Sequence, residues 1–346
     1  MRALLMERFG GPLTVREVPD PTPAPDGVVV AVGASGVCRS DWHAWSGHDS
    51  DVVLPHVPGH ELAGTVAAVG DRVRRWSVGD RVTVPFVCAC GLCPPCREGQ
   101  HQVCLRQTQP GFTHWGSFAE LVALDAADVN LVALPDDLSF ATAASLGCRF
   151  ATAFRAVTGV GRVAPGEWVA VIGCGGVGLS AVNGAALAGA SRIIAIDRLQ
   201  SKLDLARIMG ATDTILAGND DVVAQVKDLT GGGVQYSFEA LGLKATAEQS
   251  FAMLRPGGTA TIIGMIPFGV KIELHGADFL RERKIQGSSM GSNHFRVDMP
   301  RLLKLWQQGR LHLDHLISGT LALGEINAGF ARLKTGEAVR QLIRFP

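Results

Sequence analysis

The strongest constraint on the fold is an alternation of strand-like and helix-like segments between residues 150 and 290. Apolar runs such as WVAVI (168–172) and RIIAID (192–197) predict buried strands, and each is followed by a segment with helical spacing. Because strands joined through helices run parallel and are covered on both faces, the sequence predicts a doubly wound parallel sheet.

The same alternation predicts the remaining elements of this region. The predicted strands are DTILA (213–217), VQYSFEAL (234–241) and TATIIGM (259–265). We expect Ser201 and Asp220 to cap the N-termini of two of the helices, and a third helix to run on to Gly257.

A glycine pattern, Gly173-x-Gly175-x-x-Gly178, lies between the first strand and its helix. There the first glycine permits a tight turn, the second lets a pyrophosphate approach the backbone, and the third lets the helix pack against the strand. Unpaired N–H groups at the helix N-terminus attract phosphates. The turn therefore predicts a Rossmann domain whose cofactor-binding residues include Gly173, Gly175, Gly176, Val177 and Gly178.

Asp197 closes the next strand and is expected to accept hydrogen bonds from the adenosine ribose. A carboxylate there repels a 2′-phosphate, which favours NAD over NADP, although the adjacent Arg198 leaves NADP open. Cys174, inside the glycine turn, is interpreted as a small buried side chain.

The first 150 residues have a different pattern, with short apolar runs separated by Gly, Pro and Asp. This pattern predicts an irregular, mostly β domain. After about residue 290 the alternation fades. We therefore expect residues 291–346 to join residues 1–150, and residues 151–290 to form the nucleotide-binding domain.

Four cysteines cluster in the segment CGLCPPCREGQHQVC and predict a closed tetrahedral zinc site, which stabilises structure and leaves no position for substrate. Its ligands would be Cys90, Cys93, Cys96 and Cys104. The alternatives are a redox CxxC pair or unconnected buried thiols. Cys88 is a fifth cysteine that the regular spacing leaves out.

A second set of metal-ligating residues is dispersed along the chain: Cys38, His60, Glu61 and Cys148. Two cysteines and a histidine can hold a zinc ion while leaving one position open for substrate. Taken alone, each of these residues is as well explained by packing in a core.

Composition narrows the functional classes. The chain has 346 residues, with 32 basic and 32 acidic side chains and no net charge, which disfavours binding to nucleic acid. The most apolar run is interrupted by glycines, so no membrane span is expected. The first residues lack a secretory signal, so we expect a cytoplasmic protein with reduced thiols.

Several motifs, in order and spacing, resemble the zinc-dependent medium-chain alcohol dehydrogenases. They are GVCRSDWHAWSGH, VPGHELAGTVAAVG, WSVGDRV, the cysteine cluster, GCRFATAF and VIGCGGVG. The resemblance spans nearly the whole chain. It implies a GroES-like catalytic domain, a structural and a catalytic zinc, NAD, and a small alcohol or carbonyl substrate. The shorter bacterial members of the family are commonly homotetramers.

The resemblance also implies roles for single residues. Ser40 would contact the substrate oxygen, and His43 would pass the proton to solvent through the nicotinamide ribose. Asp41 would orient His60, and Arg340 would pair with Asp41. The remaining assignments are Arg39 to the pyrophosphate, Arg340 to the cofactor, Lys202 to the adenosine ribose, and Trp45 and Phe86 to the substrate pocket.

The leading hypothesis is thus reversible hydride transfer between a primary or secondary alcohol and NAD. An alternative keeps the zinc and NAD but acts on imines or aldehyde adducts. A third reading, a zinc-finger-like binding module, is disfavoured by the neutral charge and the lack of a basic recognition helix. For Glu61, the residues leave open a zinc ligand or a hydrogen-bonded buried carboxylate.

Overall fold

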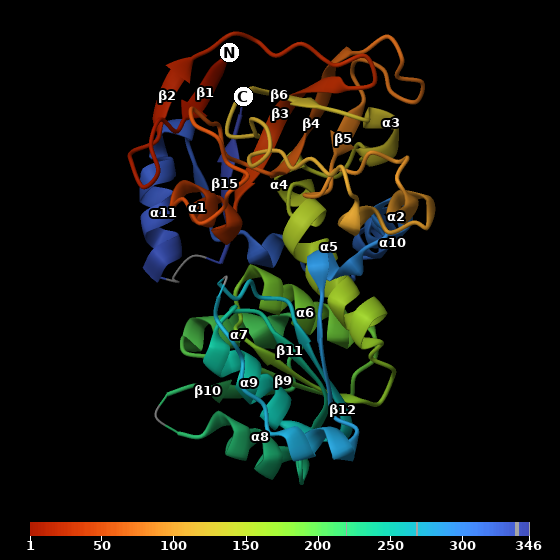
Figure 1. Cartoon of the computed structure of the whole chain (residues 1–346), viewed down its shortest axis with the longest axis vertical. Coiled ribbons are helices and arrows are strands. Elements are labelled where there is room, and N and C mark those ends of the chain that lie inside the picture. The colour runs from red at the N-terminus through yellow and green to blue at the C-terminus, as the bar shows by residue number, and fades with distance from the viewer. Residues whose placement is uncertain (219, 268, 336–338, 346) are drawn as a thin grey trace. The chain divides into compact units, whose positions relative to one another are not determined.

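The computed structural model describes residues 1–218, 220–267, 269–335 and 339–345, which form two compact units (Figure 1). One unit comprises Met1–Cys148, His294–Gln308 and Leu313–Pro346. The other comprises Arg149–Asn293 and Gly309–His312. We call them the N-terminal unit and the nucleotide unit.

The nucleotide unit is built on a parallel six-stranded sheet with strand order β10-β9-β8-β11-β12-β13. The strands are β8 (Trp168–Ile172), β9 (Arg192–Asp197), β10 (Asp213–Leu216), β11 (Val234–Glu239), β12 (Leu254–Ile262) and β13 (Lys284–Gly287). Its helices are α5 (Ala151–Arg155), α6 (Gly176–Leu187), α7 (Gln200–Ile208), α8 (Val222–Thr230) and α9 (Lys244–Ala252). The strand order reverses at β8, so the predicted doubly wound sheet is confirmed.

The N-terminal unit is mostly antiparallel β. Its main sheet has the order β14-β15-β3-β4-β5-β7, with β6 also paired to β3, and β1 pairs with β2 separately. These strands are β1 (Arg2–Leu5), β2 (Thr14–Glu17), β3 (Val28–Val37), β4 (Glu61–Val69), β5 (Arg81–Thr83), β6 (Leu121–Leu124), β7 (Val132–Ala133), β14 (Gly319–Leu321) and β15 (Gln341–Arg344). The helices are α1 (Arg39–Trp45), α2 (Pro94–Arg97), α3 (Ala127–Asn130), α4 (Phe140–Ala143), α10 (Phe295–Gln307) and α11 (Ile326–Thr335).

Three predicted helix ends are wrong. Helix α7 starts at Gln200 with Leu199 at its N-cap, so Ser201 lies inside it. The cap of α8 is Asp221, whose carboxylate accepts from two backbone amides, and not Asp220. Helix α9 ends at Ala252 because the chain pairs with β11 from Leu254 onward, so Gly257 lies in strand β12.

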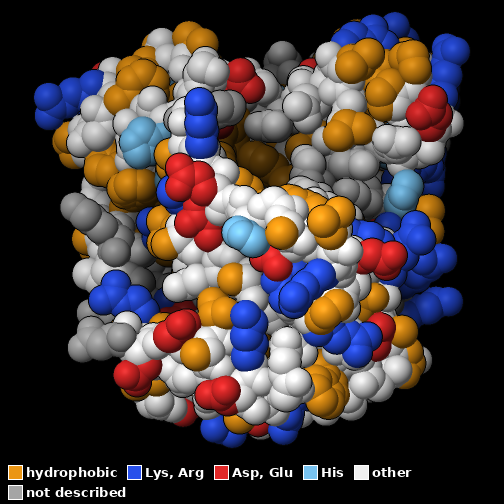
Figure 2. Space-filling view, turned by 60° about the horizontal axis from the view of Figure 1, so that its bottom comes forward, with side chains coloured by type: hydrophobic (Ala, Val, Ile, Leu, Met, Phe, Trp, Pro, Cys, Tyr) orange, Lys and Arg blue, Asp and Glu red, His pale blue; other side chains and the backbone are white. Residues whose placement is uncertain are grey.

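Two further observations concern membrane spans and surface charge in the described part of the chain. None of the helices in the described part has both the length and the apolar character needed to cross a membrane. On the face shown in Figure 2, basic and acidic side chains are interspersed, in keeping with a formal net charge of zero.

Candidate active site

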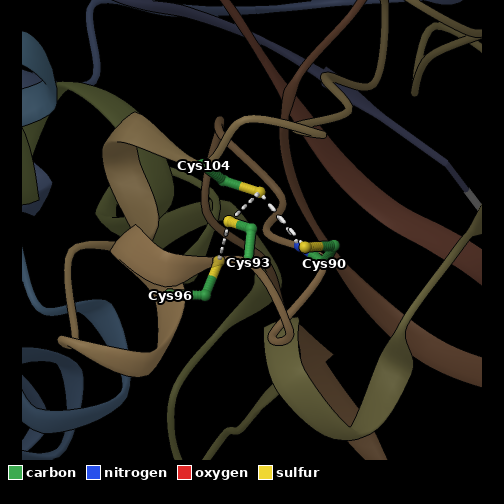
Figure 3. A group of neighbouring side chains, drawn as sticks. All are labelled: Cys90, Cys93, Cys96 and Cys104. Atoms are coloured by element: carbon green, nitrogen blue, oxygen red, sulfur yellow. Dashed lines mark hydrogen bonds between the residues drawn. The ribbon is translucent and has the colours of Figure 1, made fainter.

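The four clustered thiols of the N-terminal unit converge on one point (Figure 3). Cys93 Sγ lies 3.3 Å from Cys96 Sγ and 3.7 Å from Cys104 Sγ, which in turn lies 3.5 Å from Cys90 Sγ. All four cysteines are free thiols. Since zinc–sulfur bonds of ~2.3 Å set tetrahedral sulfur–sulfur distances of about 3.8 Å, the cluster fits a zinc ion.

Backbone amides around this cluster favour thiolates. The amides of Cys90 and Arg106 donate to Cys104 Sγ at 3.3 Å each, and the amide of Leu92 donates to Cys90 Sγ at 3.5 Å. The Leu92 amide is the main cause that lowers the pKa of Cys90 to about 6. Burial, in contrast, raises the pKa of Cys96 to about 12 and also raises that of Cys104. Zinc binds cysteine as the thiolate, so an ion among the four sulfurs would release the protons of these two thiols.

Cys88 lies outside this cluster. Its thiol donates to the carbonyl of Pro85 at 3.5 Å, and burial raises its pKa to about 12. This thiol belongs to neither group of candidate metal ligands, so Cys88 serves as a matched control for the four clustered cysteines.

The dispersed set also comes together. One ligand atom from each of Cys38, His60, Glu61 and Cys148 lies within 4.8 Å of the others, and all four residues are buried. Strand pairing explains the first three, because β3 and β4 are antiparallel neighbours with Gly36 opposite Glu61. Cys148 is supplied by a π-helical turn, Leu146–Phe150.

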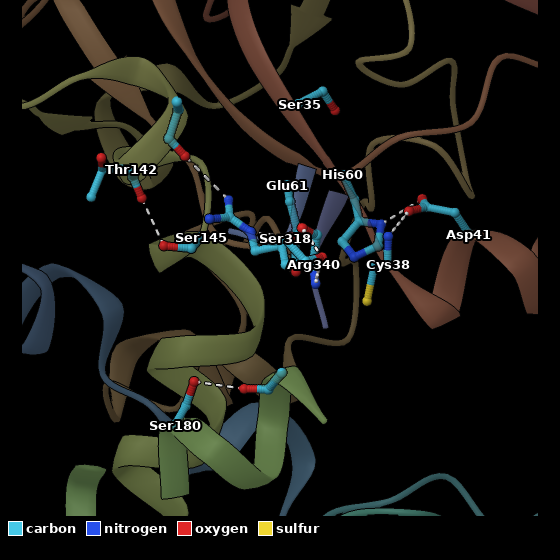
Figure 4. A network of polar contacts seen from close by, with 12 residues as sticks. Ser35, Cys38, Asp41, His60, Glu61, Thr142, Ser145, Ser180, Ser318 and Arg340 are labelled. Carbon is cyan, nitrogen blue, oxygen red and sulfur yellow. Dashed lines mark hydrogen bonds and ion pairs between the residues drawn. The ribbon is translucent and has the colours of Figure 1, made fainter. Parts of the chain in front are cut away.

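Asp41 links two members of this set (Figure 4). Its Oδ1 lies 2.8 Å from His60 Nδ1, and its Oδ2 accepts from the amide of Cys38 at 2.8 Å. The predicted contact between Asp41 and His60 is therefore present. An acceptor at Nδ1 fixes the tautomer in which the lone pair of Nε2 is available to a metal.

The surroundings of His60 Nε2 test whether a metal fits this site. This atom is buried and has no hydrogen-bond partner within the described residues. Burial alone would lower the pKa of His60, but Asp41, whose carboxylate contacts Nδ1, and then Cys38 raise it well above 6.5. Two sulfurs, an imidazole nitrogen and a carboxylate around a buried lone pair fit a zinc ion.

Arg340 differs from its prediction. Its Nε lies 3.7 Å from Glu61 Oε2, its Nη2 donates to the carbonyl of Ala141 at 3.4 Å, and the side chain is buried. The expected pairing with Asp41 is wrong: the oxygens of Asp41 contact His60 and the amide of Cys38, and Arg340 instead lies beside Glu61 (Figure 4). Its contact with the cofactor stays a prediction.

Aromatic rings surround the imidazole of His60. The Phe86 ring lies 4.6 Å from it edge-on, and Phe112 packs on both rings at 5.5 and 5.0 Å. Phe112 was missed by sequence reasoning, which had no local signal for it. Trp45, in contrast, donates to the carbonyl of Gly11 and packs against Phe330 at 5.6 Å.

Helix α1 carries the three residues assigned to phosphate binding and proton transfer. Ser40 Oγ lies 3.8 Å from Cys38 Sγ, and the Arg39 guanidinium stacks over Trp42 at 5.6 Å. His43 is half-buried, and its Nδ1 lies 3.1 Å from Nδ1 of His48, a residue the sequence did not single out. Burial, followed by Arg39 and His48, lowers the pKa of His43.

In the nucleotide unit the glycine turn leaves room for a phosphate. A Cβ on Gly178 would lie 1.7 Å from the carbonyl oxygen of Gly173, so only glycine permits this approach of helix to strand. A Cβ on Gly175 would meet nothing within 4 Å. Gly175 is the N-cap of α6, so the first amides of Gly176, Val177 and Gly178 are available to an anion.

The carboxylate of Asp197 holds the glycine turn, and its contact with the adenosine ribose stays a prediction. Its Oδ2 accepts from the amide of Cys174 at 2.7 Å, and its Oδ1 accepts from the amide of Leu199 at 3.0 Å. Cys174 is buried, and burial raises its pKa to about 12. Lys202 lies in the first turn of α7, where its contact with the ribose stays a prediction.

Two family models match the chain. The model described as "Alcohol dehydrogenase GroES-like domain" matches residues 24–136, and the one described as "Zinc-binding dehydrogenase" matches residues 176–308. Together they cover most of both units.

Curated relatives and solved structures agree with these models. An alcohol dehydrogenase of Geobacillus stearothermophilus is 36% identical, with 97% of each chain covered. An S-(hydroxymethyl)glutathione dehydrogenase of Synechocystis sp. is 32% identical over 99% of each chain. The crystal structure of benzyl alcohol dehydrogenase from Acinetobacter calcoaceticus has a TM-score of 0.94 and 29% identity, and covers 100% of this chain and 99% of that one.

Proposed function

Because the chain belongs to the zinc-dependent medium-chain alcohol dehydrogenases, we propose that its reacting centre is the buried site formed by Cys38, His60 and Cys148. The enzyme is an oxidoreductase that transfers a hydride between an alcohol and NAD, reversibly with the aldehyde or ketone. The observation that carries the proposal is that His60 Nε2 is buried without a hydrogen-bond partner among the described residues, in a residue whose ligand atom lies within 4.8 Å of those of Cys38, Glu61 and Cys148.

The three ligands leave one position of a tetrahedral shell for the substrate oxygen. A zinc ion there supplies Lewis acidity, which lowers the pKa of an alcohol and polarises a carbonyl. Glu61, whose Oε2 lies 3.7 Å from Arg340 Nε, belongs to the same group and would offer the ion a carboxylate oxygen. Asp41 keeps the imidazole in the ligating tautomer throughout.

Ser40 and His43 move the alcohol proton. Ser40 Oγ, beside Cys38 Sγ at 3.8 Å, is in position to hydrogen-bond an oxygen bound at the site. The lowered pKa of His43 keeps its imidazole neutral near pH 7, so that it can accept a proton. The glycine turn and Asp197 would hold NAD, which would supply the hydride acceptor.

The substrate is a slim apolar alcohol. Phe86 and Phe112 present ring edges and faces around His60, and these favour flat or unbranched groups over charged ones. We propose primary alcohols, with benzyl alcohol as the first probe. The carboxylates of S-(hydroxymethyl)glutathione, the aldehyde adduct named for a relative, would find no cationic partner in this ring pair.

The proposed assembly is a homotetramer in the cytoplasm. The support is resemblance in length to the shorter bacterial members of the family. Light scattering on the purified protein tests the tetramer, and a mass equal to one chain would refute it.

The experiment for the active site compares Cys38→Ser with Cys88→Ser. Cys38→Ser should lose one zinc per chain and nearly all turnover while NADH still binds, because the glycine turn is intact. Cys88→Ser should keep both. Undiminished kcat in Cys38→Ser would remove Cys38 from the site, and faster turnover of S-(hydroxymethyl)glutathione than of benzyl alcohol would reverse the substrate assignment.

A further inference from the structure

The end of α1 brings two histidines into contact, and the function proposed above uses only one of them. Nδ1 of His43 and Nδ1 of His48 lie 3.1 Å apart, which is hydrogen-bond distance. His43 is half-buried, whereas His48 is exposed. The pair thus connects an enclosed imidazole to one that water reaches directly.

The backbone fixes this arrangement. The amide of His48 donates to the carbonyl of His43 at 3.0 Å, and the amide of Gly47 donates to the carbonyl of Ala44 at 3.1 Å. These two bonds are those of a Schellman motif, with Gly47 at φ +76° as its left-handed residue. The backbone of the helix terminus therefore brings residue 48 close to residue 43, whichever side chain residue 48 carries.

One aromatic ring holds both imidazoles. Trp42 meets His43 edge-on at 5.1 Å and His48 edge-on at 5.7 Å. The same ring carries the Arg39 guanidinium at 5.6 Å. Contacts of this kind limit the rotamers of the two histidines, and the packing against Trp42 therefore helps to keep their Nδ1 atoms facing each other.

We propose that His48 receives the substrate proton from His43 and releases it to water. In the starting state His43 donates its Nδ1 proton to the lone pair of His48 Nδ1. A proton accepted at His43 Nε2 makes an imidazolium. The Nδ1 proton then moves to His48, and His48 loses its Nε2 proton to water. One proton enters and one leaves, no electrons move, and exchange with water restores the tautomers.

Electrostatics favour the outward direction. Burial, Arg39 and His48 lower the pKa of His43, while Cys38 and Asp49 oppose this. An imidazolium at His43 therefore gives up its proton readily to a neighbour that is not enclosed. His48 acts through His43 and touches no reacting atom, so it is a positioning residue for proton transfer. The inference rests on the proposed role of His43.

The test is His48→Asn, which keeps a polar group near the position of Nδ1 but cannot carry a proton at pH 6–8. We expect kcat/KM for benzyl alcohol oxidation to fall about 3- to 10-fold in dilute HEPES, and to recover when the buffer is raised about twentyfold. NADH affinity and Tm should not change. His275→Asn, on an exposed histidine of the nucleotide unit, is the control and should behave as wild type in both buffers.

Three outcomes would contradict the inference, and His43→Asn separates them. If His48→Asn matches wild type in dilute and concentrated buffer while His43→Asn is slow, the relay ends at His43 and the proposed function stands. If both variants match wild type, the proposed proton path is wrong as well. If His48→Asn is slow, insensitive to buffer and lower in Tm, then its role is structural.

Discussion

Replacing Asp41 by Asn should weaken the catalytic zinc while leaving the shape of the site intact. The carboxylate accepts two hydrogen bonds of 2.8 Å, one from His60 and one from the amide of Cys38. An amide oxygen can accept only one of these, and the amide nitrogen then points a donor at the other. The variant therefore loses one of the two hydrogen bonds and the negative charge of the acceptor in the other, which weakens the contact that fixes the tautomer of the imidazole.

The size of the effect follows from this count. A hydrogen bond to a charged group contributes roughly 1.5–3 kcal/mol. At 1.4 kcal/mol for each factor of ten, losing one corresponds to about 10- to 150-fold weaker zinc binding. Loss of an outer carboxylate partner typically costs ~10- to 100-fold in metal affinity or activity, which agrees.

The assay measures zinc affinity by competition with a chromogenic chelator, and kcat/KM and Tm are measured on the same variants. Asp51→Asn is the control, because Asp51 is exposed and lies just beyond the α1 terminus. We expect Asp41→Asn alone to release one zinc per chain at lower chelator concentration. If zinc affinity and kcat/KM of Asp41→Asn stay within about twofold of wild type, the role assigned to this carboxylate is wrong.

Three further changes probe the rest of the structure. Cys93→Ser should remove the zinc of the four-cysteine site and lower Tm by roughly 5 °C or more, because metal binding there stabilises the fold. Cys88→Ser, measured alongside, should keep its zinc, and an unchanged Tm in Cys93→Ser would argue against a structural site. Gly178→Ala places a Cβ 1.7 Å from a carbonyl oxygen, so NADH binding by fluorescence should fall at least about tenfold with zinc content unchanged, and normal NADH affinity would contradict the packing argument. Asp197→Gly should lower the NAD/NADP ratio of kcat/KM by about tenfold or more, and it should also loosen the glycine turn by removing the acceptor of the Cys174 amide. An unaltered ratio would mean that another residue, such as Arg198, sets the preference.

The parts of the fold that local periodicity determines were predictable from the sequence. The runs at 168–172 and 192–197 are strands β8 and β9, because a parallel strand covered on both faces must be apolar throughout. The end of α9 was not predictable, since pairing of Leu254 with Val234 of β11 overrides a segment that reads as helix. The caps of α7 and α8, which lie two residues and one residue from their predicted positions, reflect backbone geometry that spacing does not fix.

The candidate site also contains residues that the sequence could predict and residues that it could not. The four clustered cysteines could be proposed from their spacing, and the dispersed ligands from the family motifs that contain them. The structure brings the residues of each group together. The partner of Arg340 could not, because it depends on β15 and β4 lying on either side of β3. Phe112 and His48 also lacked a sequence signal: one depends on a long-range ring contact, and the other on how the turn after α1 closes.

The most direct measurement is anomalous diffraction at the zinc edge from crystals of the purified protein. The account predicts two peaks per chain, one among Cys90, Cys93, Cys96 and Cys104, and one about 2.0–2.3 Å from His60 Nε2 and the sulfurs of Cys38 and Cys148. A protein that oxidises alcohols with NAD at full rate but shows no peak beside His60 would contradict it.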